Sequence, residues 1–153
     1  MSQPPLPVFK DVIAPKYIFG YNGNFRNNVF LHYEPIKLIY PAGNNIIIYN
    51  TDDESQVFLY PNQGTNSITT MALSQNRRYL AWAEEAEVGI IVVYDLQTGK
   101  KKMLTSVDSG SRSYISLSFS KDETKGLYSL VKYQNNKYIF ILNFIIKPEN
   151  INS

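Results

Sequence analysis

The chain contains no cysteine and only one histidine among its 153 residues. The lack of cysteine excludes disulfides and thiolate metal sites, and a single histidine leaves the usual catalytic triads incomplete. That residue, His32, follows the apolar segment Val29-Phe30-Leu31, where we expect a packing or surface side chain. No serine lies in a Gly-x-Ser-x-Gly elbow. The composition therefore favours a non-catalytic protein with no metal and no other cofactor.

Strong charge of either sign and long apolar runs are missing as well. The 15 basic and 13 acidic residues leave a formal charge of +2, which argues neither for nucleic acid nor for a strongly anionic surface as a partner. We expect no nucleic-acid partner. The longest apolar stretch, residues 138–146, is too short to span a bilayer and is interrupted by Asn143. Residues 1–16 hold no apolar signal core. We expect a soluble intracellular protein without a membrane partner.

The sequence does contain a blade-like pattern between Met71 and Leu104. The apolar run at residues 90–94 is typical of strands that are buried on both faces. Tyr94-Asp95 stands where a WD repeat carries its Trp-Asp pair, so we expect the ring to pack between blades and the carboxylate to cap the next turn. The segments of this blade are a turn at 74–78, a strand at 79–83, a polar loop at 84–87, a strand at 90–95 and a turn at 97–99.

Two further copies of this pattern flank the first. Aligning Ser74 with Ser120 gives a period of about 46 residues, close to the roughly 40 to 45 residues of this repeat class. In the downstream copy, residues 113–122 repeat the pattern of residues 68–76, and two more strands follow at 126–133 and 137–144 around a turn at 134–136. The shorter upstream copy has strands at 36–40, 45–49 and 56–60 with turns at 41–44 and 50–54. The predicted fold class is all-β, a partial WD-repeat β-propeller of about three four-stranded blades, the last without a clear outer strand.

The expected organisation is an extended Pro-rich arm over residues 1–16, the partial propeller over residues 17–147 and a tail over residues 148–153. The arm is either a flexible tail or, because apolar side chains are interspersed with its prolines, a docking segment for a partner's groove. Closed propellers use about four to eight blades, so three blades cannot close a ring. An open arc exposes apolar faces at both ends, and we expect this chain to be unstable alone unless a partner or further blades cover them.

The carboxylate clusters Asp52-Asp53-Glu54 and Glu84-Glu85-Glu87 fall at predicted hairpin tips, where we expect solvated turns. Neither cluster has the alternating oxygen ligands and glycine of a calcium loop. The alternative that they leave open is a hydrolase-like site with carboxylates at the axial mouth of the propeller.

Two short features are candidates for docking or regulation. If the hairpins align, a basic rim able to meet an acidic partner by salt-sensitive attraction would form from Arg77, Arg78, Lys100, Lys101 and Lys102. Residues 108–113 have the form Asp-Ser-Gly-x-x-Ser that ubiquitin ligases recognise, which makes Ser109 and Ser113 a candidate phospho-motif. The alternatives are solvated surface for the rim and ordinary turn chemistry for the motif.

The aromatic residues within the predicted strands are expected in core and blade-to-blade packing, not in nucleic-acid stacking. They are Tyr79, Trp82, Tyr94, Tyr114, Phe119, Tyr138 and Phe140.

Four segments stand out when they are taken in chain order. They are Tyr17-Ile18-Phe19-Gly20, Phe25-Arg26-Asn27-Asn28-Val29-Phe30, Ile39-Tyr40-Pro41-Ala42-Gly43-Asn44 and Ser74-Gln75-Asn76-Arg77-Arg78-Tyr79-Leu80-Ala81. In this order they resemble the opening of the WD-repeat flagellar family typified by cilia- and flagella-associated protein 57. The resemblance runs from about residue 17 to residue 144.

This resemblance implies a place in the axoneme of a cilium or flagellum, within a scaffold that positions inner dynein arms on doublet microtubules. The implied partners are axonemal propeller or coiled-coil scaffolds, tubulin or inner dynein arm components. The family's coiled coil has no counterpart among these residues, so its dimerisation is not carried over. The alternatives are a generic cytoplasmic WD-repeat interaction scaffold and a non-functional fragment of a longer propeller protein.

Overall fold

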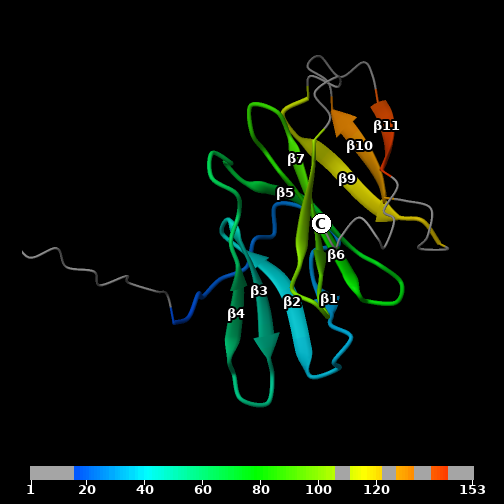
Figure 1. Ribbon diagram of the computed structural model, residues 1–153. Coiled ribbons are helices and arrows are strands. Elements are labelled where there is room, and N and C mark those ends of the chain that lie inside the picture. The colour runs from blue at the N-terminus through cyan, green and yellow to red at the C-terminus, as the bar shows by residue number, and fades with distance from the viewer. Residues whose placement is uncertain (1–15, 106–110, 122–126, 133–138, 145–153) are drawn as a thin grey trace, which may run out of the picture.

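The computed structural model describes residues 16–105, 111–121, 127–132 and 139–144, and these ranges form three antiparallel sheets along the chain (Figure 1). The first sheet contains β1 (Phe30–Leu31), β2 (Lys37–Ala42), β3 (Asn45–Asn50) and β4 (Gln56–Leu59). The second contains β5 (Ile68–Leu73), β6 (Tyr79–Glu84), β7 (Ile90–Asp95) and β8 (Lys101–Thr105). The third contains β9 (Tyr114–Phe119), β10 (Leu127–Lys132) and β11 (Ile139–Phe144). Within the described residues, no helix has the length and apolar character that crossing a membrane would require.

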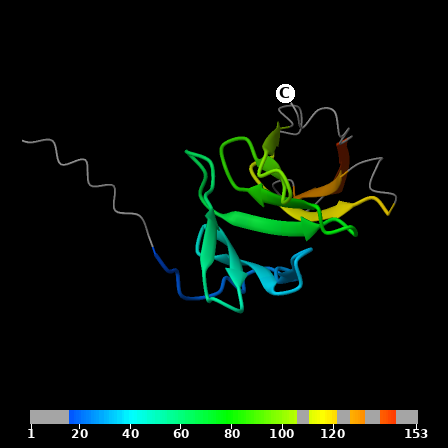
Figure 2. The same cartoon turned by 60° about the horizontal axis from the view of Figure 1, so that its bottom comes forward.

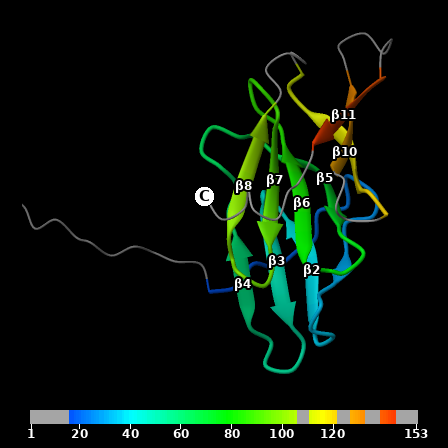
Figure 3. The same ribbon diagram turned by 45° about the vertical axis from the view of Figure 1, so that its right-hand side comes forward.

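We call the three sheets blades 1, 2 and 3. Within each blade the strands pair in chain order, and blade 2 lies between the other two (Figures 2 and 3). The all-β fold class and the blade pattern are therefore confirmed. The sequence pattern missed β1, the two-residue edge strand of blade 1, and the described part of blade 3 holds three strands.

The most buried strand is β6, in which all six residues are buried. Because successive side chains of a strand point to opposite faces, Leu80 and Trp82 pack toward blade 1, whereas Ala81 and Ala83 pack toward blade 3. Burial of each large apolar side chain contributes roughly 1.5 to 3 kcal/mol. Coverage of both faces explains why the central strands of blade 2 show no regular apolar-polar alternation.

Blade 3 approaches blade 2 closely at the loop between β6 and β7. Ala86 N–H donates to the carbonyl of Arg112 at 3.1 Å, and Gly89 N–H donates to the carbonyl of Ser111 at 2.9 Å. A Cβ at Gly89 would lie 3.0 Å from Cε2 of the fully buried Tyr114 and 3.1 Å from the Arg112 carbonyl. This loop therefore needs a glycine to receive the segment that leads into β9.

The hairpin between β2 and β3 is tighter than predicted. The expected turn at residues 41–44 is two residues too long: Gly43 and Asn44 form the turn, whereas Pro41 and Ala42 belong to β2 and face Ile46 and Asn45 across the ladder. Proline lacks an N–H and is tolerated where its strand has no ladder partner on that side. The short β1 pairs only with Leu38 and Ile39, and the carbonyl of Pro41 instead accepts a hydrogen bond from Asn22 N–H at 2.9 Å.

The prediction that Glu84 lies in a solvated hairpin tip is also wrong. Glu84 ends β6 and its exposed fraction is 0%. Its carboxylate accepts hydrogen bonds from Trp82 Nε1 at 2.7 Å and from Asn62 N and Nδ2 at 3.0 and 3.1 Å. A buried carboxylate requires such donors, so Glu84 fixes the connection between blades 1 and 2 at the end of β6.

Candidate interaction site

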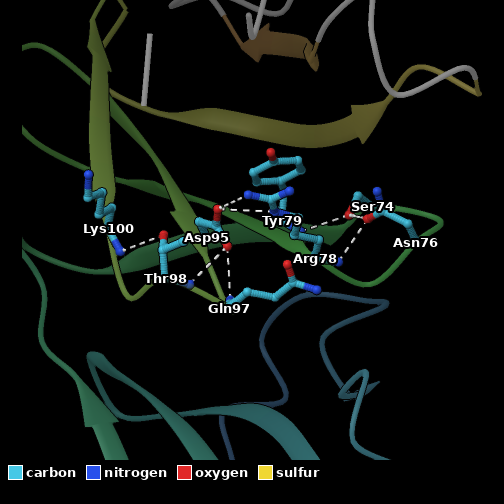
Figure 4. A network of polar contacts seen from close by, with 8 residues as sticks. All are labelled: Ser74, Asn76, Arg78, Tyr79, Asp95, Gln97, Thr98 and Lys100. Carbon is cyan, nitrogen blue, oxygen red and sulfur yellow. Dashed lines mark hydrogen bonds and ion pairs between the residues drawn. The ribbon is translucent and has the colours of Figure 1, made fainter. Parts of the chain in front are cut away.

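Asp95, the acid of the WD-like pair of blade 2, organises the turns at one end of the blade (Figure 4). Asp95 Oδ1 accepts hydrogen bonds from Gln97 N and Thr98 N at 2.9 and 3.2 Å, as expected for a turn-capping acid. Its Oδ2 accepts from Arg78 Nε and Nη2 at 3.1 and 2.8 Å. Burial opposes ionisation, but the donors from Arg78 and the two backbone N–H groups outweigh it and hold the pKa of Asp95 below its usual value. Tyr94 packs in the boundary with blade 1.

Blade 1 repeats the backbone geometry of these turns. The N–H of His32 donates to the carbonyl of Lys37 at 3.0 Å, just as Ser74 N–H donates to the carbonyl of Tyr79 at 2.9 Å. His32 in blade 1 therefore occupies the position of Ser74 in blade 2.

A second backbone bond extends this correspondence. Thr51 N–H donates to the carbonyl of Ile36 at 2.9 Å, and Leu96 N–H donates to the carbonyl of Arg78 at 2.8 Å. Ile36 thus replaces Arg78. The residue before Thr51 is Asn50, which stands where blade 2 has its acid and caps its own turn by accepting Asp52 N–H at 3.0 Å. Blade 1 consequently lacks the ion pair of blade 2.

The residues of the predicted basic rim lie on neighbouring turns and on β8. Arg77 and Lys100 are exposed, and the bond from Leu96 to the carbonyl of Arg78 joins their turns. The guanidinium of Arg78, however, is held by Asp95, with an Nη2-to-Oδ2 distance of 2.8 Å. Lys101 and Lys102 are successive residues of β8 and therefore point to opposite faces of the blade. The rim remains a prediction, carried mainly by Arg77, Lys100 and Lys101.

Of the predicted phospho-motif, Ser109 lies outside the described residues. Ser113 is half-buried, and its backbone N–H donates to Ser111 Oγ at 3.4 Å. Ser111 Oγ in turn donates to the carbonyl of Ser113 at 2.8 Å. These contacts are those of a turn, and the regulatory role of Ser109 and Ser113 stays a prediction.

The other candidate residues from the sequence lie in the packed interior or in turns. His32 is buried, with an exposed fraction of 3%, and its ring lies 4.1 Å from that of Tyr33. Asp53 is exposed in the turn between β3 and β4, as predicted. Among the described residues, no three His, Asp or Glu side chains converge in a way that could hold a metal ion. Tyr79, Trp82 and Tyr114 are buried in the blade boundaries.

The outer face of blade 1 is partly covered by the chain that precedes β1. Ile18 is held by the side-chain amide of Gln56, which accepts from Ile18 N at 2.9 Å and donates to Ile18 O at 3.3 Å. We call residues 16–22 the strap. Three of its aromatic side chains are exposed: Tyr17 by 45%, Phe19 by 89% and Tyr21 by 55%. The packing of the strap against β4 was not predicted, because its residues follow no strand period; residues 17–20 entered only through the family resemblance.

No family model matches the chain. Its structure is similar to the β-propeller domain of Cps50 (Swd1) from Myceliophteria thermophila, with a TM-score of 0.58 and 13% identity over 80% of this chain and 36% of that one. It is also similar to U3-55K, with a TM-score of 0.53 and 18% identity over 76% of this chain and 38% of that one. Together with the blade topology and the capping acid, these similarities define the chain as a partial WD-repeat β-propeller.

Its similar sequences are ciliary proteins. Cilia- and flagella-associated protein 57 A of Tetrahymena thermophila is 46% identical over 83 residues, which are 53% of this chain and 6% of that protein. Protein 57 C of the same organism is 34% identical over 77% of this chain and 10% of its own length. The Mus musculus cilia- and flagella-associated protein 57 is 34% identical over 69% of this chain and 9% of its own length.

The resemblance to the WD-repeat flagellar family typified by cilia- and flagella-associated protein 57 is thereby confirmed. The chain spans about a tenth or less of the length of these relatives. The expected location also agrees with them, since the relatives are cilia- and flagella-associated proteins.

Proposed function

We propose that the chain is a non-catalytic WD-repeat interaction module of the ciliary or flagellar axoneme. Its blades would form part of a scaffold that positions inner dynein arms or related complexes on doublet microtubules. The ciliary relatives support the location. The scaffold role is supported by the polar residues, whose described contacts cap turns and connect blades.

One observation carries the proposal: an exposed aromatic row at the outer face of blade 1. Tyr17, Phe19 and Tyr21 are all exposed on the strap, and Phe19 has an exposed fraction of 89%. Clustered exposed apolar side chains mark interaction surfaces, and aromatic residues are the common anchors of such interfaces. A partner or a further blade that packs on this row would bury it.

The test is fractionation of cilia from cells that express the tagged full chain. We expect the chain to remain with the axoneme after detergent extraction and to co-purify with inner dynein arm components. The double change Tyr17→Ser and Phe19→Ser should reduce retention several-fold. Gln63→Ser, at an exposed polar residue of the loop between β4 and β5, is the matched control and should leave retention unchanged.

Each other outcome selects an alternative. A folded chain found only in the cytoplasm would support a generic WD-repeat scaffold and contradict the ciliary role. Retention in the axoneme without inner dynein arm components would keep the location and contradict the dynein-arm scaffold. If the strap variants left retention in the axoneme unchanged, the aromatic row would not be the surface that contacts the partner.

The basic rim supplies a second contact within the same proposal. Arg77 and Lys101 are exposed and would attract the acidic tails of tubulin in a salt-sensitive way. We expect microtubule co-sedimentation of the full chain to fall with salt and after proteolytic removal of the tails. Arg77→Gln with Lys101→Gln should weaken it, whereas Lys121→Gln, an exposed lysine next to β9, should not. Binding that survives tail removal would refute this contact.

A further inference from the structure

A polar groove of about 400 Å³ lies at the boundary between blades 1 and 2. The β1–β2 and β3–β4 turns of blade 1 form one side, and Tyr94 and Leu96 of blade 2 form the other. The groove lies where blade 1 lacks the counterpart of the Arg78–Asp95 ion pair. Ile48 and Val57 line an apolar part of the groove.

His32 is a buried side chain that lines this groove. Its Nδ1 accepts a hydrogen bond from Glu34 N–H at 3.0 Å, so the neutral ring carries its proton on Nε2. Burial, opposed by Glu34 and aided by Lys37, lowers the pKa of His32 and keeps the ring neutral at pH 7. No hydrogen bond of Nε2 occurs among the contacts of the described residues. A buried donor without a partner is costly, and in this position a ligand would supply the acceptor.

The charges around the groove leave it acidic. Glu34 and Asp53 line it, and they face one ammonium group, that of Lys37, whose Nζ lies 2.6 Å from Glu34 Oε2. Asp95 lies next to Tyr94, but Arg78 already compensates its charge. The groove therefore carries one uncompensated negative charge at neutral pH, beside the rings of Tyr33 and Tyr94.

We propose that this groove binds the guanidinium side chain of an arginine in a partner peptide. The guanidinium would meet Glu34 and Asp53, its plane would stack on a tyrosine ring, and a carbonyl of the same peptide would accept the His32 Nε2 proton. Arginine fits better than lysine because its planar group donates in several directions and stacks on aromatic rings. This inference is independent of the ciliary role.

The single histidine of the chain makes the test direct, because its imidazole signals in an NMR spectrum belong to His32 alone. The full chain is titrated with N-acetylarginine amide and with N-acetylcitrulline amide, its uncharged analogue of nearly equal shape. We expect a saturable shift of the His32 ring signals with the arginine compound. The citrulline compound should bind about tenfold more weakly, since it lacks the charge-assisted contacts.

Variants then locate the binding. Asp53→Asn with Glu34→Gln should weaken arginine binding about tenfold, whereas Asp52→Asn, at an exposed residue that does not line the groove, should leave it unchanged. Preserved His32 signals and tryptophan fluorescence check that each variant is folded. If the double variant fails to fold, Asp53→Asn alone, a change in an exposed turn, serves in its place.

Several results would overturn the proposal. They are equal binding of the citrulline compound, no effect of removing the carboxylates, and a His32 signal that does not move. Tighter binding of N-acetylglutamate amide would instead assign an anion to the groove and contradict the proposal. None of these results bears on retention in axonemes, so failure here and failure of the ciliary role are distinguishable.

Discussion

Blades 1 and 2 share the backbone hydrogen bonds of their turns and differ in the side chains placed on them. Blade 2 joins Arg78 and Asp95 in an ion pair across two turns. Blade 1 has Ile36 and Asn50 at these positions, and its turns line a groove beside the buried His32. The comparison teaches that the repeat preserves main-chain geometry, while side chains decide whether a turn closes on itself or stays available for a ligand.

The largest effect on the free energy of unfolding should come from a difference in burial between the second strands of blades 1 and 2. Trp82 is nearly fully buried in the boundary of blades 1 and 2, whereas its counterpart on β2, Tyr40, is half-buried. Trp82→Ala should lower the free energy of unfolding by about 3 to 5 kcal/mol through the cavity that it leaves. Tyr40→Ala should cost clearly less. Denaturant midpoints of the full chain measure both, and equal losses would refute the view of blade 2 as the central blade.

The next effect concerns the buried carboxylate at the end of β6. Both carboxylate oxygens of Glu84 accept hydrogen bonds, from Trp82 and from Asn62. Ala42 takes the corresponding place in blade 1. Glu84→Gln would turn an amide NH₂ toward Trp82 Nε1 or Asn62, so we expect a loss of about 1 to 3 kcal/mol. Glu85→Gln, on the next and more exposed residue, is the control. If Glu84→Gln left the free energy of unfolding unchanged in the same assay, the hydrogen bonds from Trp82 and Asn62 to the carboxylate would be contradicted.

Breaking the ion pair of blade 2 should have a smaller effect. Asp95→Asn keeps an acceptor for the turn but removes the charge that holds Arg78, and we expect a loss of about 1 to 2 kcal/mol because Arg78 is partly exposed. The pKa of Asp95 is lowered in the folded state. Its contribution is therefore complete above the unfolded pKa of about 4 and is lost as the pH falls through the lower folded value.

Acid unfolding of the two proteins checks this. The wild-type chain should lose its advantage over Asp95→Asn below about pH 4. Placing Ile36→Arg and Asn50→Asp together in blade 1 should recreate the pair there and close part of the groove. A constant difference between wild type and Asp95→Asn at all pH values would mean that the charge of Asp95 is irrelevant.

The smallest effect is a pH dependence in blade 1 that comes from His32, whose position in blade 2 is held by Ser74. Burial lowers the pKa of His32, so its unfolded form binds a proton more readily. The contribution of the neutral ring is complete above the unfolded pKa of about 6.5 and is lost as the pH falls through the lower folded value. Unfolding midpoints between about pH 8 and pH 5 should therefore fall more for the wild type than for His32→Gln. Parallel curves would show that His32 titrates as it does in the unfolded chain.

Most of the strand pattern of blade 2 could be predicted, because β6 and β7 are buried on both faces and their sequence shows it directly. The capping role of Asp95 was predicted too, since an acid that follows an aromatic strand end is a local signal. Pro41 was misassigned because its tolerance in β2 depends on the shortness of β1, which is a tertiary fact.

Side-chain partners far apart in sequence could not be predicted. The burial of Glu84 depends on Asn62, which lies 22 residues away. The groove beside His32 depends on Tyr94 from another blade. In both cases a polar residue has the same local sequence context whether water or the protein surrounds it. A comparison of Ile36 with Arg78 by repeat position could have indicated the missing ion pair.

The hold of Gln56 on Ile18 has a mechanical consequence. One amide side chain bonds both the N–H and the carbonyl of the same residue, at 2.9 and 3.3 Å, and so imitates one rung of a strand ladder. The next backbone bond of the strap to blade 1 is that of Asn22 N–H to the carbonyl of Pro41. A pull on the chain ahead of Lys16 would load the two bonds of Gln56 together and, once they yield, peel the strap away while the ladders β1–β2–β3–β4 stay paired. In an organelle that bends, we expect the strap to act as a release point that yields before the blade does.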